Sequence, residues 1–338
     1  MAPVPASSIP DTVPALLDRA ARDFPERSIE LLDARGRSAG SLPFPQLRER
    51  LVDAGGRMLA LGVEPGDRVV VALGTSWEWL DAWFGVHLAG ALPVSIAPPG
   101  AMGSPTAQIE KTVRVAARLG ARFVVAPGTF EKEVEELWSD SERAQLPPVL
   151  RPETLAATAP ADARLPSLDA RPEDTAFLQL TSGSTGFPRA VEISHAAAAH
   201  NPWACAQAIG APKGDPGWCE TMVSWLPLHH DMGLIGGLLV PLVNGFDLKL
   251  LTPRSFLARP HLWLQALARH GTSMSPAPNF GYQLCTERVR PRQLEGLDLG
   301  LFRSALTGSE MVRPETMAAF SQLAEPYGFD PRNVMPCY

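Results

Sequence analysis

The sequence predicts an α/β protein with two α/β subdomains, each built on a largely parallel sheet that is flanked by helices. Short apolar runs alternate along the chain with segments whose apolar residues recur at helical spacing. Most of these runs are continuously apolar, which is typical of parallel strands covered on both faces. A Pro/Ala-rich stretch without a clear period, residues 141–174, is expected to connect the two series.

The first subdomain is expected to cover residues 1–140. Asp11 is suited to cap a first helix, because a carboxylate accepts hydrogen bonds from the unpaired N–H groups of the first turn. Pro45 is suited to begin a second helix, since its fixed φ fits the first helical position, and Gly62 is suited to end it. The elements expected next are a strand at 68–73, a helix at 77–88, a strand at 93–97, a helix at 107–119 and a strand at 122–126.

The second subdomain is expected to cover residues 175–338. Its apolar runs predict strands near 175–180, 223–226, 247–251, 272–275 and 302–306. Helical spacing predicts helices between them, including 254–270 and 314–324.

Composition and charge exclude several classes of protein. A net charge of -6 argues against a nucleic-acid or anionic-membrane surface, which would require a basic face. The longest apolar stretch, 233–243, is well short of the roughly 20 residues that span a bilayer. No basic and apolar leader is visible, so a cytoplasmic protein is expected. No C-x-x-C spacing suggests a zinc site or a disulfide framework among the four cysteines, Cys205, Cys219, Cys285 and Cys337.

One run of small residues predicts a phosphate-binding loop. An apolar strand leads directly into Thr181, Ser182, Gly183, Ser184, Thr185 and Gly186. Hydroxyls and exposed backbone N–H groups can surround a polyphosphate, and glycine allows the backbone to approach it closely. The run lacks the Gly-Lys-Ser/Thr ending of a Walker A loop. A surface linker is the alternative, but linkers seldom lie between two strand-like segments.

This run resembles the phosphate-binding motif of the adenylate-forming enzymes, which include acyl-CoA synthetases, firefly luciferase and nonribosomal peptide adenylation domains. The usual form is Thr-Ser-Gly-Ser/Thr-Thr-Gly-x-Pro-Lys-Gly, and this chain has Arg189 and Ala190 in place of Lys-Gly. Arginine keeps the positive charge but presents a planar fork in place of a compact ammonium. The resemblance implies that residues 181–186 and Arg189 bind the phosphates of ATP, with Mg²⁺ offsetting their charge.

A second segment carries adjacent imidazoles and a carboxylate, His229, His230 and Asp231, where a strand ends and an apolar helix begins. Asp231 is placed to cap that helix. A metal site is disfavoured, because neighbouring residues rarely point at one ion. The surrounding Leu-Pro-Leu-x-His-Asp-Met-Gly-Leu-Ile-Gly pattern is similar to the acyl-recognition motif of one subgroup, the fatty acyl-AMP ligases. It implies that His230 faces the reacting carboxylate and that Met232 and Gly233 border the acyl pocket.

Two later segments complete the candidate site. A strand ending in Gly308, Ser309 and Glu310 brings backbone groups to the carboxyl end of a sheet, where open α/β folds bind nucleotides. An ordinary strand-to-helix turn is the alternative. By resemblance these three residues border the adenine. Asn279 and Phe280 lie in a Pro-Asn-Phe-x-Tyr-x-Leu-Cys segment that also resembles the fatty acyl-AMP ligases and is expected to wall the acyl pocket.

The resemblance runs from Leu16 to Tyr338. It implies that Tyr338 stacks on adenine, and that an Mg²⁺-binding Glu, a third subdomain and a C-terminal lid with a catalytic Lys would follow. The chain is therefore expected to be a fragment that contains no metal ligand and is inactive alone.

The expected function is activation of a fatty acid with ATP to acyl-adenylate and pyrophosphate. The acyl group would pass to the phosphopantetheine thiol of an acyl carrier protein. Two alternatives remain open from the sequence. One is an acyl-CoA synthetase with CoA as the acceptor, and the other is a non-catalytic module that binds an acyl group or a carrier.

Overall fold

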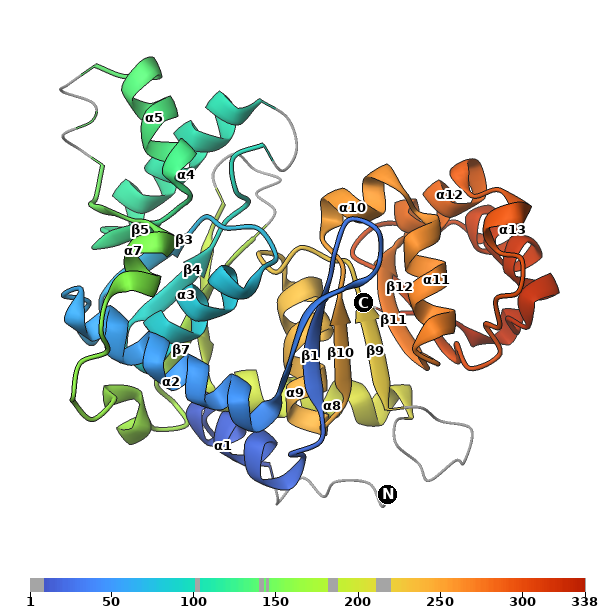
Figure 1. The fold of residues 1–338 in the computed structure, drawn as a ribbon, viewed down its shortest axis with the longest axis horizontal. Coiled ribbons are helices and arrows are strands. Elements are labelled where there is room, and N and C mark those ends of the chain that lie inside the picture. The colour runs from blue at the N-terminus through green and yellow to red at the C-terminus, as the bar shows by residue number, and fades with distance from the viewer. Residues whose placement is uncertain are drawn as a thin grey trace. The chain divides into compact units, whose positions relative to one another are not determined.

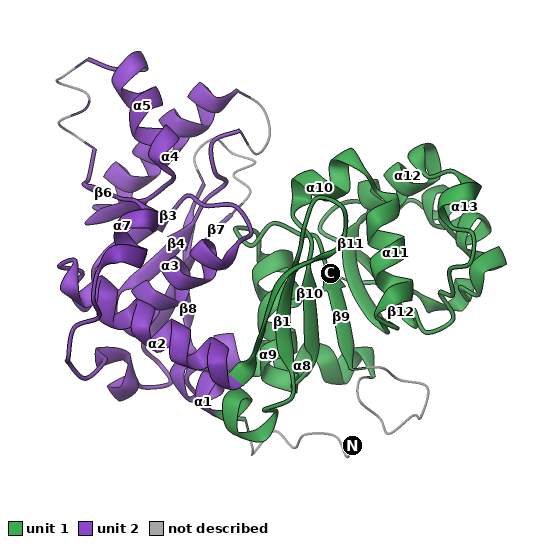
Figure 2. Ribbon diagram, in the orientation of Figure 1, with its two compact units in different colours: residues 1–9, 19–44, 200–338 green, residues 10–18, 45–199 purple. Residues whose placement is uncertain are grey.

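The structure is a computed structural model that describes residues 9–100, 104–139, 143, 146–181, 188–210 and 220–337. The chain forms two compact units, which Figure 2 colours separately. Unit 1 comprises residues 1–9, 19–44 and 200–338, and unit 2 comprises residues 10–18 and 45–199. Each unit contains a mainly parallel sheet with helices against it (Figure 1), so the predicted fold class is confirmed.

Unit 2 is built on a six-stranded sheet with the order β6-β5-β3-β4-β7-β8. All its described pairings are parallel except that of β8 with β7. The strands are β3 (Arg68–Val71), β4 (Leu92–Ser95), β5 (Phe123–Val125), β6 (Val149–Leu150), β7 (Thr175–Leu180) and β8 (Ala190–Ser194). The helices are α2 (Phe44–Ala60), α3 (Trp77–Leu88), α4 (Pro105–Leu119), α5 (Gly128–Leu137), α7 (Pro152–Ala157) and the 3-10 helix η2 (Pro166–Asp169).

Unit 1 is built on a seven-stranded sheet with the order β13-β12-β11-β9-β10-β1-β2. Of its described strand pairings, only that of β2 with β1 is antiparallel. The strands are β1 (Ser28–Leu32), β2 (Ser38–Pro43), β9 (Thr221–Ser224), β10 (Asp247–Leu250), β11 (Met274–Pro278), β12 (Ser304–Gly308) and β13 (Val334–Pro336). The longer helices are η3 (Met232–Leu239), α9 (Val240–Asn244), α10 (Pro253–Ala258), α11 (His261–Arg269), α12 (Asn279–Arg288) and α13 (Pro314–Ala324). Three short 3-10 helices are η4 (Pro291–Gln293), η5 (Glu325–Tyr327) and η6 (Pro331–Asn333).

Two helices are each divided between the units, because a boundary between the units falls within them. They are α1 (Val13–Asp23) and α8 (His195–Ile209).

The two units do not follow the expected boundaries of 1–140, 141–174 and 175–338. Residues 175–199 belong to unit 2, because β7 continues its sheet through the parallel pairing of Leu178 with Val94. Residues 28–43 belong to unit 1, because Ile29 pairs with Leu248 across more than two hundred positions of sequence. The stretch 141–174, expected as a connection between subdomains, lies inside unit 2, where it contributes β6, α7 and η2.

The helix expected at 254–270 is divided into α10 and α11. Proline disfavours helical geometry in the residue before it, and Arg259, which precedes Pro260, leaves the helical region with φ -145° and ψ 78°. The strand expected at 272–275 is β11, which runs farther, to Pro278.

An aromatic cluster forms the core of unit 1 beside the carboxyl end of its sheet. Trp225 stacks on Phe256 with ring centroids 3.7 Å apart, and Trp263 meets Tyr282 edge to face. The buried Tyr282 hydroxyl donates to the Leu306 carbonyl at 2.8 Å. Because aromatic side chains bury large areas, these contacts fix the end of β9 and helix α12 against β12.

A buried histidine gives unit 2 a pH-dependent stability. His87 of α3 is 1% exposed, and its Nδ1 lies 2.9 Å from the Ala176 carbonyl oxygen, to which it donates. Burial, reinforced by the neighbouring His195, lowers the pKa of His87 to about 3. The neutral imidazole is therefore the form that fits the folded chain.

The free energy of unfolding is expected to decrease as the pH falls from 6.5 towards 3. An unfolded histidine binds a proton near pH 6.5, whereas folded His87 does not, so unfolding takes up one proton in this range. The loss from His87 is expected to be about 1.4 kcal/mol per pH unit. Urea unfolding of wild type and His87→Gln between pH 5 and 8 measures this contribution. Equal slopes below pH 6.5 in the two proteins would contradict it.

Candidate functional site

The ends of the predicted phosphate loop lie at the base of a hairpin in unit 2. Thr181 follows β7, and Arg189 precedes β8, its antiparallel neighbour. The Thr181 N–H donates to the Arg189 carbonyl at 2.9 Å, and the Arg189 N–H donates to Thr181 Oγ1 at 3.1 Å. The predicted phosphate loop therefore connects two paired strands of one sheet. Both Thr181 and Arg189 are exposed. Outside the described residues lie Ser182, Gly183, Ser184, Thr185 and Gly186.

The segment with the two imidazoles follows β9 in unit 1 and forms a tight turn. The His230 N–H donates to the Pro227 carbonyl at 3.2 Å, and the His229 and His230 rings lie 4.7 Å apart. His230 is exposed, whereas His229 is half-buried. Asp231 Oδ1 accepts from the Met232 N–H at 2.7 Å, which confirms the predicted capping role of Asp231.

The helix that follows is a π-helix, η3, whose wider turns the sequence did not indicate. Gly233 in its first turn is buried directly against the preceding turn. A Cβ atom at this position would lie only 2.1 Å from the Pro227 carbonyl oxygen. Glycine is therefore required for the start of η3 to lie this close to the backbone of Pro227.

The segments predicted for the acyl pocket and for the adenine site are neighbours in the sheet of unit 1. Pro278, the last residue of β11, pairs in parallel with Gly308, the last residue of β12. Beyond the strands, the Phe280 N–H donates to Glu310 Oε1 at 2.6 Å. Asn279 is 4% exposed and Phe280 is 41% exposed, so only the ring presents a large open surface.

Contacts of Ser309 and Gly308 bring two further segments to this edge. Ser309 Oγ donates to Met232 Sδ at 3.2 Å, which joins the turn after β12 to η3. A Cβ at Gly308 would lie 2.1 Å from the Cys337 carbonyl oxygen, so this glycine allows the chain after β13 to approach. Tyr338, the next residue, lies outside the described residues.

The structure thus brings together Met232 and Gly233, Asn279 and Phe280, and the turn at 308–310, and it places His230 next to them in sequence. They lie at the carboxyl ends of parallel strands, where open α/β sheets bind ligands. This edge offers an exposed imidazole, backbone groups and an open apolar ring. The sequence did not single out Arg313 or Cys337, which belong to this cluster only through tertiary contacts.

Within the ranges that the structure describes, no group of three or more His, Cys, Asp or Glu side chains is arranged to hold a metal ion. No helix within the same ranges is long and apolar enough to cross a membrane.

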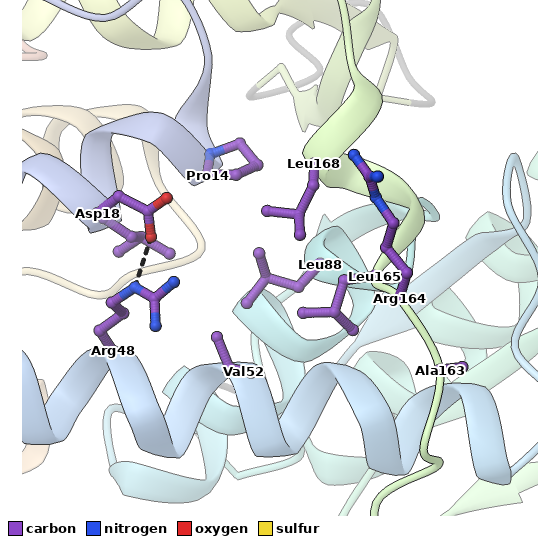
Figure 3. A pocket seen from close by; sticks show the side chains of 10 residues that line it. Pro14, Asp18, Arg48, Val52, Leu88, Ala163, Arg164, Leu165 and Leu168 are labelled. Atoms are coloured by element: carbon purple, nitrogen blue, oxygen red, sulfur yellow. Dashed lines mark hydrogen bonds and ion pairs between the residues drawn. The ribbon is translucent and has the colours of Figure 1, made fainter.

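A cavity of about 210 Å³ lies in unit 2, and its lining includes none of the residues that the sequence predicted for the site (Figure 3). Its wall is mainly apolar, and the ion pair between Arg48 Nε and Asp18 Oδ1 lies at one side of it. The lining residues are Pro14, Leu17, Asp18, Arg48, Val52, Leu88, Ala163, Arg164, Leu165 and Leu168.

Comparison with known proteins agrees with these observations. The sequence profile of the family described as AMP-binding enzyme matches residues 17–334. The long-chain-fatty-acid–AMP ligase FadD26 of Mycobacterium marinum is 32% identical over 338 residues, which cover 97% of this chain and 56% of the relative. A Caulobacter vibrioides protein that carries the provisional name acyl-CoA synthetase is 34% identical over 327 residues, covering 97% of this chain and 55% of the relative.

Solved structures show the same similarity. One from structural and functional studies of fatty acyl-adenylate ligases from E. coli and L. pneumophila superposes with a TM-score of 0.86 and 32% identity, covering 99% of this chain and 58% of that one. The fatty acyl-adenylate ligase from L. pneumophila in complex with acyl adenylate and pyrophosphate has a TM-score of 0.79 and 28% identity, over 97% of this chain and 55% of that one. The chain spans about half the length of the curated relatives it matches. With a profile match over nearly its whole length, the chain belongs to the AMP-binding enzyme family.

Proposed function

We propose that the gene product containing this chain is a fatty acyl-AMP ligase, which converts a fatty acid and ATP into acyl-adenylate and pyrophosphate. The main support is the cluster at the carboxyl edge of the unit 1 sheet. In this cluster Ser309 contacts Met232, and Glu310 contacts the backbone of Phe280. Acyl-side and nucleotide-side segments that are distant in sequence therefore lie within hydrogen-bond distance. The similarity to a ligase bound to acyl adenylate and pyrophosphate supports the same reaction.

In this reaction a carboxylate oxygen of the fatty acid attacks the α-phosphorus of ATP, and the bond to the pyrophosphate oxygen breaks. Such chemistry depends on positioning and on charge neutralisation more than on covalent help from the protein. His230 orients the carboxylate, and Arg189 with the hydroxyl and N–H groups of residues 181–186 steadies the β- and γ-phosphates. Mg²⁺ would offset the charge of the phosphates, and the described residues include no group of three or more His, Cys, Asp or Glu side chains arranged to hold a metal ion.

The remaining site residues divide between the two ends of the adenylate. Backbone groups of Gly308, Ser309 and Glu310, together with the ring of Tyr338, hold the adenine. The acyl chain runs from His230 past the segment of Met232 and Gly233 and the segment of Asn279 and Phe280, of which Gly233 and Asn279 are buried and Phe280 is exposed. Phe280 is open to contact with an aliphatic ligand, because its side chain is 41% exposed.

The acceptor of the acyl group is proposed to be the phosphopantetheine thiol of an acyl carrier protein. CoA is the second candidate, favoured by the provisional name of the Caulobacter vibrioides relative. Mass spectrometry of the gene product with ATP and dodecanoate should detect acyl-AMP. Parallel reactions with holo-carrier protein and with CoA then identify the acceptor. Binding of dodecanoate without any acyl-AMP would instead indicate a non-catalytic acyl-binding module.

Arg189→Ala is expected to raise the KM for ATP, whereas Arg189→Lys should leave it near the wild-type value. Lysine keeps the positive charge that phosphate requires, even though it lacks the planar fork. Hydrogen bonds to charged groups are worth about 1.5–3 kcal/mol, so the alanine variant should lose about tenfold or more in affinity. Pyrophosphate exchange at varied ATP concentration measures both variants. A lysine variant as weak as the alanine variant would contradict a role based on charge.

A further inference from the structure

The side chain of Glu310 is engaged within the protein at the start of α12. Pro278 occupies the N-cap position of this helix and makes no side-chain cap hydrogen bond. The first N–H groups of a helix have no partner within it, and they favour a nearby negative charge. Glu310 Oε1 accepts from one of them, the Phe280 N–H, at 2.6 Å. A carboxylate from the turn after β12 therefore takes the place of the missing cap.

A second contact runs in the opposite direction between the same two segments. Asn279, the first residue of α12, accepts from the Arg313 N–H through Oδ1 at 2.9 Å. Its amide nitrogen also lies 3.4 Å from Thr316 Oγ1 in α13. The turn after β12 is thus fastened to the first turn of α12 at two points, Glu310 to Phe280 and Arg313 to Asn279. We refer to these two hydrogen bonds as the clamp.

A backbone conformation that is costly for a side-chain-bearing residue lies directly before the clamp in the sequence. Ser309 has φ +64° and is the one non-glycine residue with positive φ in the described part of the chain. Such conformations persist where the surroundings hold them, and they are frequent at functional sites. Gly308 is held by its pairing with Pro278, and Glu310 is held by Phe280. Between these two fixed residues, Ser309 is directed at Met232 of η3.

We infer that Glu310 is a positioning residue that couples the acyl-side segment to the adenine-side turn. This inference rests on the proposed function and deepens it. The Glu310 carboxylate holds α12 and the turn as one rigid body, and the backbone of the turn, not this carboxylate, meets the nucleotide. The acyl surface at Phe280 and the adenine surface at Ser309 then cannot move independently. Loss of the carboxylate loosens both surfaces together.

The test compares Glu310→Ala with Glu310→Gln in the gene product. Pyrophosphate exchange with ATP and dodecanoate gives the KM for each substrate. Glu310→Ala is expected to raise both KM values by about tenfold, since it removes one hydrogen bond to a charged group. Glu310→Gln keeps an acceptor oxygen for the Phe280 N–H and should restore most of the loss. Glu315→Ala, an exposed carboxylate in the first turn of α13, is the matched control and should leave both values unchanged.

Several outcomes would overturn the inference. A rise in the KM for ATP alone would mean that the carboxylate contacts the nucleotide. A lower melting temperature with unchanged KM values would reduce Glu310 to a structural cap. Amide hydrogen exchange of the first turn of α12 provides a readout that does not need catalysis, and it should be faster in Glu310→Ala and not in Glu310→Gln. If wild type makes no acyl-AMP, the proposed function fails. Equal rates of amide hydrogen exchange in wild type and Glu310→Ala would overturn the clamp as well.

Discussion

Gly233→Ala is expected to lower the free energy of unfolding by about 3 kcal/mol, the upper part of the range for overpacked cores, and to abolish adenylation. The added Cβ would lie 2.1 Å from the Pro227 carbonyl oxygen and 2.8 Å from its carbonyl carbon. Both are backbone atoms of the turn that follows β9, so no side-chain rotation can relieve the contact. The turn that carries His230 must therefore shift, and with it the reacting end of the proposed acyl site.

A matched control lies one turn farther along the same helix. A Cβ at Gly236 would meet nothing within 4 Å. Alanine is favoured over glycine in a helix by roughly 0.5–1 kcal/mol, so Gly236→Ala should be neutral or slightly stabilising. Urea unfolding and pyrophosphate exchange of the two variants give the comparison. A Gly233→Ala protein as stable and active as Gly236→Ala would show that the close approach to Pro227 is not needed.

Elements with strong local signals could be predicted from the sequence. The helices expected at 77–88 and 314–324 agree with α3 and α13 at both ends. Local chemistry explains this agreement, because Ser76 caps α3 through the Trp79 N–H and Pro314 fits the first position of α13. Asp231 was predictable as a cap for the same reason.

Features that depend on distant partners could not be predicted. No local pattern shows that Ile29 pairs with Leu248, and the strand pair β1–β2 was accordingly missed. The same limit applied to the division between units, since the placement of β7 depends on its pairing with β4. In the candidate site, the sequence singled out the segments at 229–233, 279–280 and 308–310, and their roles stay predictions. It did not show that Glu310 would bond to the backbone of Phe280 or that Ser309 would have positive φ.

His230→Ala is expected to lower the rate of adenylation by roughly 10²–10³, the usual effect of removing one positioned polar group at a reacting centre. His229→Ala should cost much less. The two rings lie 4.7 Å apart in one turn with an interplanar angle of 45°, and they differ in exposure. His230 is exposed beside the cap of η3, whereas His229 is half-buried. The exposed imidazole is the more accessible of the two to an incoming carboxylate.

Pyrophosphate exchange with ATP and dodecanoate at saturating concentrations measures this difference as a rate, and thermal unfolding checks that both variants keep their fold. The pairing of the two substitutions is informative because each removes the same ring from the same turn. A general weakening of the turn would lower the rate in both variants alike. Loss of a contact with the substrate carboxylate would lower the rate only in His230→Ala. Equal losses, or a larger loss in His229→Ala, would show that His230 is not the imidazole that orients the substrate.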